Sequence, residues 1–146
     1  MSIGKLLELA IAGDQVLALA WDDGRTAMVD LAGVIAGHAA LSGLADSKLF
    51  ALAQLSDDGW SAEWPNGVDF GAQQLRRWAD EQAGETMAPQ TFRAWVERHG
   101  FTLERAADAL GLSRRTIAYY LSGEQVVPKT VFLATEGYDQ IGRAHV

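Results

Sequence analysis

The sequence predicts an α+β chain with two domains: a small, mostly antiparallel sheet domain over residues 1–84, then an all-α domain of four helices over residues 88–146. In the first part, turn signals separate short apolar runs, which is typical of antiparallel strands. After residue 88, apolar side chains recur at three- and four-residue spacing, which is typical of amphipathic helices. The charge balance of the chain also changes near residue 88. Residues 1–86 hold 5 basic and 13 acidic residues, and residues 87–146 hold 7 and 6, so the balance changes from −8 to +1.

The composition is that of a globular chain without a membrane span. Of its 146 residues, 49% are hydrophobic and 21% are charged, and no run of 18 apolar residues occurs. The N-terminal apolar run is interrupted by Glu8 and Asp14, which argues against a secretory signal. The chain has no cysteine, which excludes disulfides and thiolate chemistry and favours a cytoplasmic protein.

Short apolar runs between turn dipeptides predict five strands in the first domain. The turns are Gly13-Asp14, Asp23-Gly24 and Asp58-Gly59, since glycine next to aspartate favours tight connections. The expected strands cover residues 5–13, 15–21, 25–30, 49–55 and 60–64. Single helical turns are expected within residues 31–40 and 46–50, and a longer helix at 73–81.

The polar side chains of this domain do not predict a catalytic, cofactor or metal site. Its turns carry the carboxylates Asp22, Asp23, Asp57, Asp58 and Asp69. Aspartate beside glycine commonly caps and bends the backbone, and neither these acids nor the three histidines match zinc or calcium spacing.

The first domain also contains two tryptophans close together in the sequence. Trp60 and Trp64 would share a face of the last expected strand, because side chains alternate along a strand. Packing in the core is the favoured role for this pair. A ligand platform or a surface for a basic partner protein are the alternatives.

The second domain begins after a polar segment, residues 80–90, which is expected to link the two. Its first helix should start at Pro89 and end at Gly100, and Thr102 should cap a second helix over residues 103–110. Ser113 should cap a third helix that ends at Gly123. Pro128 is expected to start a fourth helix that ends near residue 137, unless residues 138–141 extend it.

The second and third helices have the pattern of a helix-turn-helix. The expected buried stripe of the second helix is Leu103, Ala106, Ala107 and Leu110. Two helices that cross at a short turn approach closely, which explains the alanines. Gly111 suits the left-handed end of the helix, and Leu112 lies five residues before Ile117, the spacing of a hydrophobic staple.

Sequence motifs in each part resemble a known family. The motifs W-D-D-G-R (21–25) and E-W-P-N-G-V-D-F (63–70), with V-D-L and L-F between them, resemble the DUF2442 family over residues 5–80. That resemblance implies a small bacterial domain, with no particular chemistry, that also occurs joined to a C-terminal helix-turn-helix. The run A-x-A-L-G-L-S-x-R-T-I-x-x-Y-L-S-G-E resembles the lambda-repressor-like (Cro/C1, XRE-type) DNA-binding domains over residues 89–137. Leu103 departs from that pattern, which often has glutamine there.

The second resemblance implies that the third helix enters the DNA major groove by its N-terminal part. Arginine suits the O6/N7 pair of guanine because its guanidinium is planar and bidentate. Hydroxyl and lysine side chains near helix starts suit phosphates. The candidate DNA-binding residues are Ser113, Arg114, Arg115, Thr116, Tyr119 and Lys129.

The sequence therefore predicts a bacterial, sequence-specific DNA-binding transcriptional regulator whose partner is double-stranded DNA. A single small motif makes few contacts, so a homodimer is expected. The alternative is an antitoxin-like or adaptor protein that binds a basic protein through its acidic N-terminal domain. An enzyme is not expected, because no nucleophile is paired with a base.

Overall fold

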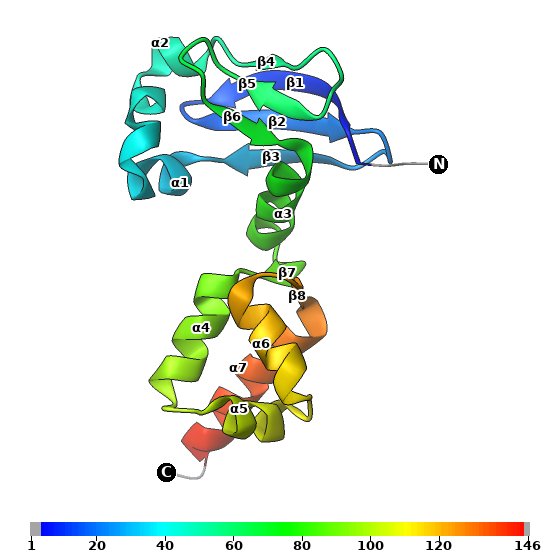
Figure 1. Cartoon of the computed structure of the whole chain (residues 1–146), viewed down its shortest axis with the longest axis vertical. Helices are drawn as coiled ribbons and strands as arrows, with labels where there is room; N and C mark the ends of the chain where they lie inside the picture. Colours follow the sequence, from blue (N-terminus) through cyan, green and yellow to red (C-terminus); the bar gives the residue numbers. More distant parts are fainter. Residues whose placement is uncertain (1–3, 145–146) are drawn as a thin grey trace. The chain divides into compact units, whose positions relative to one another are not determined.

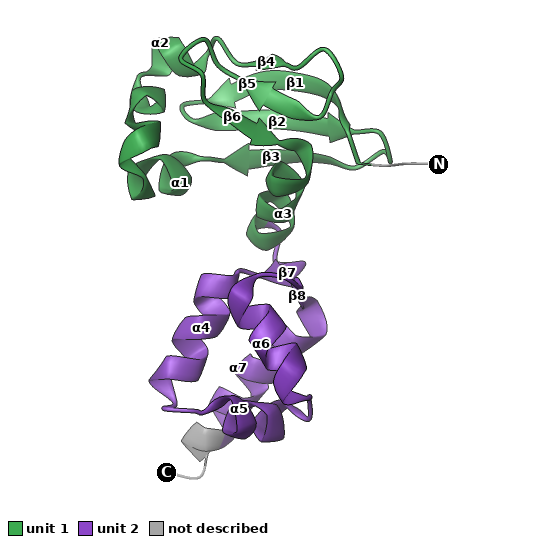
Figure 2. Cartoon of the chain, in the orientation of Figure 1, with its two compact units in different colours: residues 1–82 green, residues 83–146 purple. Residues whose placement is uncertain are grey.

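The computed structural model describes the backbone of residues 4–144 and the side chains of residues 4–141. The chain forms two compact units, residues 1–82 and residues 83–146 (Figure 2). The first is an α+β unit with antiparallel sheets and the second is mainly helical, as predicted. No helix within the described backbone is long and apolar enough to cross a membrane.

Unit 1 begins with three antiparallel strands in the order β1-β2-β3, drawn in blue in Figure 1. A second small sheet has the order β4-β5-β6. The strands are β1 (Leu6–Gly13), β2 (Val16–Trp21), β3 (Thr26–Asp30), β4 (Gln54–Leu55), β5 (Ser61–Glu63) and β6 (Asp69–Gly71). The helices are α1 (Ala32–Gly37), the 3-10 helix η1 (Ala39–Ala45), α2 (Ser47–Phe50) and α3 (Ala72–Gln82).

Large buried side chains join the elements of unit 1. Leu17 and Val29, paired across β2 and β3, are both fully buried. The indole of buried Trp21 donates to the backbone oxygen of Ala72, the first residue of α3, at 3.0 Å. Because an unpaired buried N–H would be costly, this bond favours one position of α3 on the sheet.

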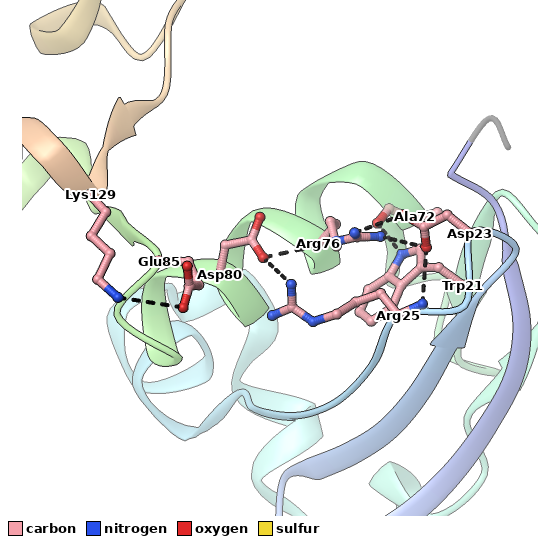
Figure 3. A network of polar contacts seen from close by, with 8 residues as sticks. All are labelled: Trp21, Asp23, Arg25, Ala72, Arg76, Asp80, Glu85 and Lys129. Carbon is pink, nitrogen blue, oxygen red and sulfur yellow. Dashed lines mark hydrogen bonds and ion pairs between the residues drawn. The ribbon is translucent and has the colours of Figure 1, made fainter.

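Polar contacts around α3 give the W-D-D-G-R motif a structural role (Figure 3). Arg76 donates to both carboxylate oxygens of Asp23, at 3.1 and 2.8 Å, and its guanidinium carbon lies 5.2 Å from the centre of the Trp21 ring. Arg25 pairs with Asp80 at 2.8 Å. Hydrogen bonds from Arg76 and from the backbone N–H of Arg25 hold the pKa of Asp23 below its usual value. The motif thus ties the β2–β3 hairpin to α3.

Three local expectations for unit 1 are corrected. Residues 49–55 are not one strand. Asp46 accepts from the backbone N–H of Lys48 and caps α2, so only residues 54–55 remain extended. Strand β6 was not expected, since three residues are too few to show a periodic pattern. Trp60 and Trp64 do not form one packed pair, because Trp64 lies against Phe50 and Phe70 while Trp60 is exposed. Trp64 is 4% exposed and packed in the core, whereas Trp60 is 36% exposed.

One glycine marks a close approach of two backbones in unit 1. Gly59 has φ +79°, and its carbonyl accepts from the backbone N–H of Leu6 at 2.7 Å. A Cβ added at this residue would lie 2.7 Å from the carbonyl oxygen of Leu6. Glycine is needed here both for its dihedral angle and for the lack of a side chain.

Unit 2 contains four helices and one small ribbon in its described residues. The helices are α4 (Pro89–Arg98), α5 (Leu103–Leu110), α6 (Arg114–Ser122) and α7 (Lys129–Ala144). The antiparallel ribbon joins β7 (Thr86–Met87) to β8 (Val127–Pro128). The core is built from buried side chains of all these elements, among them Met87, Phe92, Trp95, Ala106, Ile117 and Val127.

The structure corrects two expectations for unit 2 and decides between two alternatives for a third. Residues 86–87 lie in the expected linker but form β7, and Met87 is only 5% exposed. The fourth helix continues past Gly137 to Ala144, which was the alternative left open. A glycine inside a helix costs about 1 kcal/mol relative to alanine, and the two residues after it, Tyr138 and Asp139, both contact Trp95 of α4. Leu103, expected to be buried, is 36% exposed.

Candidate nucleic-acid interface

The turn between α5 and α6 is held by caps at both helices. Thr102 Oγ1 accepts from the backbone N–H of Arg105 at 3.1 Å, at the start of α5. Gly111 ends that helix in the left-handed conformation, with φ 68° and ψ 33°. Ser113 Oγ then accepts from the backbone N–H of Thr116 at 3.1 Å, at the start of α6. The predicted caps and the turn glycine are therefore confirmed.

Apolar packing sets the angle between the two helices. Ala106 and Ala107 of α5 are buried, and α5 packs against α6. Leu112 lies just before the cap of α6 and Ile117 just after its first turn, and both belong to the same apolar cluster. This is the hydrophobic-staple arrangement, which fixes how α6 leaves the turn.

Helix α6 is also held at its C-terminal end. Arg93 of α4 donates to the backbone oxygen of Leu121 at 2.9 Å, which satisfies one of the free carbonyls at the helix end. The rings of Phe92 and Tyr120 meet edge to face at 5.5 Å between centroids. Burial raises the pKa of Tyr120. Helix α6 is thus braced at both ends, and its outer side is left exposed.

The outer side of α6 carries two exposed arginines in its first turn. Arg114 makes no ion pair with any residue whose side chain is described. Arg115 Nε donates to the hydroxyl of Tyr119 at 2.8 Å, and its guanidinium carbon lies 5.3 Å from the centre of that ring. Two uncompensated cations at the N-terminal end of a braced helix form a small surface suited to phosphates and base edges.

The other predicted site residues have local partners. The hydroxyls of Ser113 and Thr116 lie 2.9 Å apart and belong to the cap of α6. Lys129 is the first residue of α7, on a different element, and its Nζ lies 3.8 Å from a carboxylate oxygen of Glu85 (Figure 3). The structure therefore gathers Ser113, Arg114, Arg115 and Thr116 at the start of α6, with Tyr119 one turn further along the helix and Lys129 on α7.

A polar clasp connects α4 to the C-terminal half of α7. Asp139 accepts from Trp95 Nε1 at 3.0 Å and from Arg98 at 2.8 Å, and His99 Nε2 lies 2.6 Å from the same carboxylate. The His99 ring stacks on Phe101 with centroids 5.1 Å apart. Burial raises the pKa of Asp139, but hydrogen bonds from His99 and Trp95 outweigh this and hold that pKa below its ordinary value.

Sequence reasoning missed the supporting roles of Arg93 and Asp139. Both side chains act through partners at least 28 residues away in the chain, so no local spacing marked them. Asp139 also lies beyond Gly137, where the helix was expected to end. A polar residue on the apolar side of an extended α7 was the one signal that could have identified it.

The capped turn, the braced second helix and its exposed arginines define the second unit as a helix-turn-helix domain. Comparison with family models agrees, because residues 72–135 match the family described as "Helix-turn-helix domain". Residues 8–81, half of the chain, match the family described as "Protein of unknown function (DUF2442)". The chain belongs to the DUF2442 family and joins that domain to a C-terminal helix-turn-helix, as predicted.

One solved structure is similar over most of the chain. It is the crystal structure of "Putative DNA Binding Protein NE0471" from Nitrosomonas europaea, with 31% sequence identity and a TM-score of 0.54. The similarity covers 92% of this chain and 86% of the other. A search of curated proteins found no match.

Proposed function

We propose that this protein binds double-stranded DNA sequence-specifically, with the N-terminal part of α6 in the major groove, and that it acts as a transcriptional regulator. The observation that carries the proposal is the exposed pair Arg114 and Arg115 at the start of a helix braced at both ends. The helix-turn-helix family match supports it, as does the likeness to a protein named as DNA-binding.

The size of the surface supports a homodimer as the active form. One α6 offers few side chains to base edges, and the whole chain carries a net charge of −7, so long-range attraction to DNA is weak. Two copies on half-sites about 34 Å apart would double the contacts and read a palindrome. Of the predicted residues, Arg114, Arg115, Thr116, Tyr119 and Lys129 would then act from each copy, and Ser113 would act as the cap of α6.

Selection of bound sequences from a random duplex pool at fixed salt tests the proposal. The unaltered chain should enrich one motif with two related halves, and the double variant Arg114→Ala/Arg115→Ala should enrich none. The double variant Lys5→Ala/Lys48→Ala is the matched control, because it removes the same charge from unit 1. Equal enrichment by the arginine variant and the unaltered chain would contradict the proposal.

A second function is favoured by unpaired acids on unit 1. Exposed carboxylates with no partner among the described side chains are Glu8, Asp14, Asp57, Glu63 and Asp69. These acids suit an adaptor or antitoxin-like protein that binds a basic protein. Co-expression with neighbouring genes, followed by capture of the full chain, tests this. The idea fails if no basic protein is retained at any of several salt concentrations.

A further inference from the structure

The contact between Arg115 and Tyr119 separates the roles of the two arginines on α6. These two residues are four apart on the helix, so their side chains lie over the same face. Arg115 Nε donates to the Tyr119 hydroxyl at 2.8 Å, and the guanidinium lies over the ring. Arg114, its neighbour, has no ion pair or hydrogen bond of this kind with a described side chain.

The hydrogen bond decides which edge of the Arg115 guanidinium remains available. Arginine can grip two acceptors with its two terminal nitrogens, or with Nε and one terminal nitrogen. Tyr119 occupies Nε, so the terminal pair is the edge left for a ligand. That pair matches the O6 and N7 acceptors of guanine in the major groove.

The same contact lowers the entropy that Arg115 loses on binding. A free arginine side chain samples many rotamers, and ordering them opposes binding. The ring of Tyr119 is itself half-buried, and its backbone lies in the middle of α6. Arg115 is therefore held in one orientation before DNA arrives, whereas Arg114 keeps its freedom.

We infer that Tyr119 is a positioning residue that presents Arg115 to one guanine in each half-site, and that Arg114 contributes charge to phosphate binding without base preference. The inference rests on the proposed DNA binding. It assigns Tyr119 a role through Arg115, in place of the direct DNA contact that the sequence suggested. No carboxylate pairs with Arg115 among the described residues, so its outward edge is not neutralised.

A double-mutant cycle on full-length protein tests the inference. The motif selected from the random pool by the unaltered chain is synthesised, together with duplexes in which each guanine is replaced in turn. Tyr119→Phe keeps the ring and removes the hydroxyl, so it should lower discrimination at one guanine about three- to tenfold. Arg115→Ala should abolish preference at that same position. Adding Tyr119→Phe to Arg115→Ala should cause no further change in discrimination at that guanine.

Arg114→Ala serves as the comparison for the charge role. It should weaken binding to all duplexes by a similar factor and reduce the slope of log affinity against log salt by about one. Tyr119→Phe should leave that slope unchanged. Thermal unfolding of each variant confirms that unit 2 is folded at the assay temperature.

These measurements distinguish failure of the inference about Tyr119 from failure of the proposed DNA binding. If Tyr119→Phe discriminates as well as the unaltered chain, or weakens discrimination in the Arg115→Ala background too, the inference is overturned while DNA binding stands. The same holds if no guanine in the selected motif depends on Arg115. If the unaltered chain selects no motif at all, the proposed function itself fails, and the inference fails with it.

Discussion

Replacing Ser113 with alanine should test whether this residue serves only as a helix cap. Its hydroxyl oxygen accepts from the backbone N–H of Thr116 at 3.1 Å, and Thr102 makes the equivalent bond to the backbone N–H of Arg105, also at 3.1 Å. Loss of a cap to alanine costs about 1 kcal/mol of stability. For a domain of this size, that corresponds to a fall of about 4–8 °C in the unfolding midpoint.

Thr102→Ala is therefore a matched control, because it removes the same kind of bond from the helix that precedes the turn. Both variants should show the same fall in midpoint, followed by circular dichroism of the full chain. At a temperature where both are folded, both should bind the selected duplex with affinity close to that of the unaltered protein. Ser113→Asp keeps a good cap but places a negative charge at the start of α6, so it should stay stable and lose DNA affinity.

Two results would refute this reasoning. An unchanged midpoint for Ser113→Ala would mean that the observed cap contributes no stability. A tenfold loss of DNA affinity for Ser113→Ala, with affinity retained by Thr102→Ala, would mean that the Ser113 hydroxyl contacts DNA as well as capping the helix. Both quantities come from the same protein samples, so stability and binding are compared directly.

Two further predictions concern stability. Gly59→Ala should cost unit 1 about 2–4 kcal/mol, from a positive φ at about 1–2 kcal/mol and disruption of the contact with Leu6. Gly67 has φ +90° and no atom near an added Cβ, so Gly67→Ala should cost only the contribution of the positive φ. Equal denaturation midpoints for Gly59→Ala and Gly67→Ala would contradict the prediction. Asp139→Ala should destabilise unit 2 by about 1–3 kcal/mol, since it leaves the buried Trp95 indole unpaired. Because the pKa of Asp139 is lowered in the fold, its contribution is present above the ordinary value of 3.8 and is lost as pH falls below it. Acid titration should therefore show a larger difference in unfolding midpoint between the unaltered chain and Asp139→Ala above pH 3.8 than at a pH below the lowered pKa of Asp139.

The elements that sequence reasoning placed correctly depend on neighbours within a few residues. Thr102 and Ser113 were recognised as caps because the group they satisfy lies three residues ahead. Gly111 was recognised because a left-handed helix end favours glycine whatever the rest of the fold does. The hairpin of β1 and β2 was recognised from two short apolar runs and the turn between them.

The elements that it misplaced depend on partners far along the chain. Ribbon β7–β8 pairs Met87 with Val127, and a two-residue strand carries no periodic pattern of its own. The length of α7 beyond Gly137 depends on packing of Tyr138 against Trp95 and on the clasp of Asp139. The burial of Trp64 depends on Phe50, whose backbone oxygen accepts from the Trp64 indole and whose ring lies against it.

The sequence by itself determined the two-part organisation, the family of the N-terminal domain and the helix-turn-helix with its caps. The organisation and the helix-turn-helix follow from spacing and local backbone preference, which a chain carries before it folds, and the family follows from the resemblance of the motifs at 21–25 and 63–70. Only the tertiary structure decided that Arg93 of α4 braces the end of α6 and that the ring of Phe92 packs edge to face on Tyr120. Those contacts require particular side-chain directions and distances, and these exist only after α4 and α6 have packed around a common core.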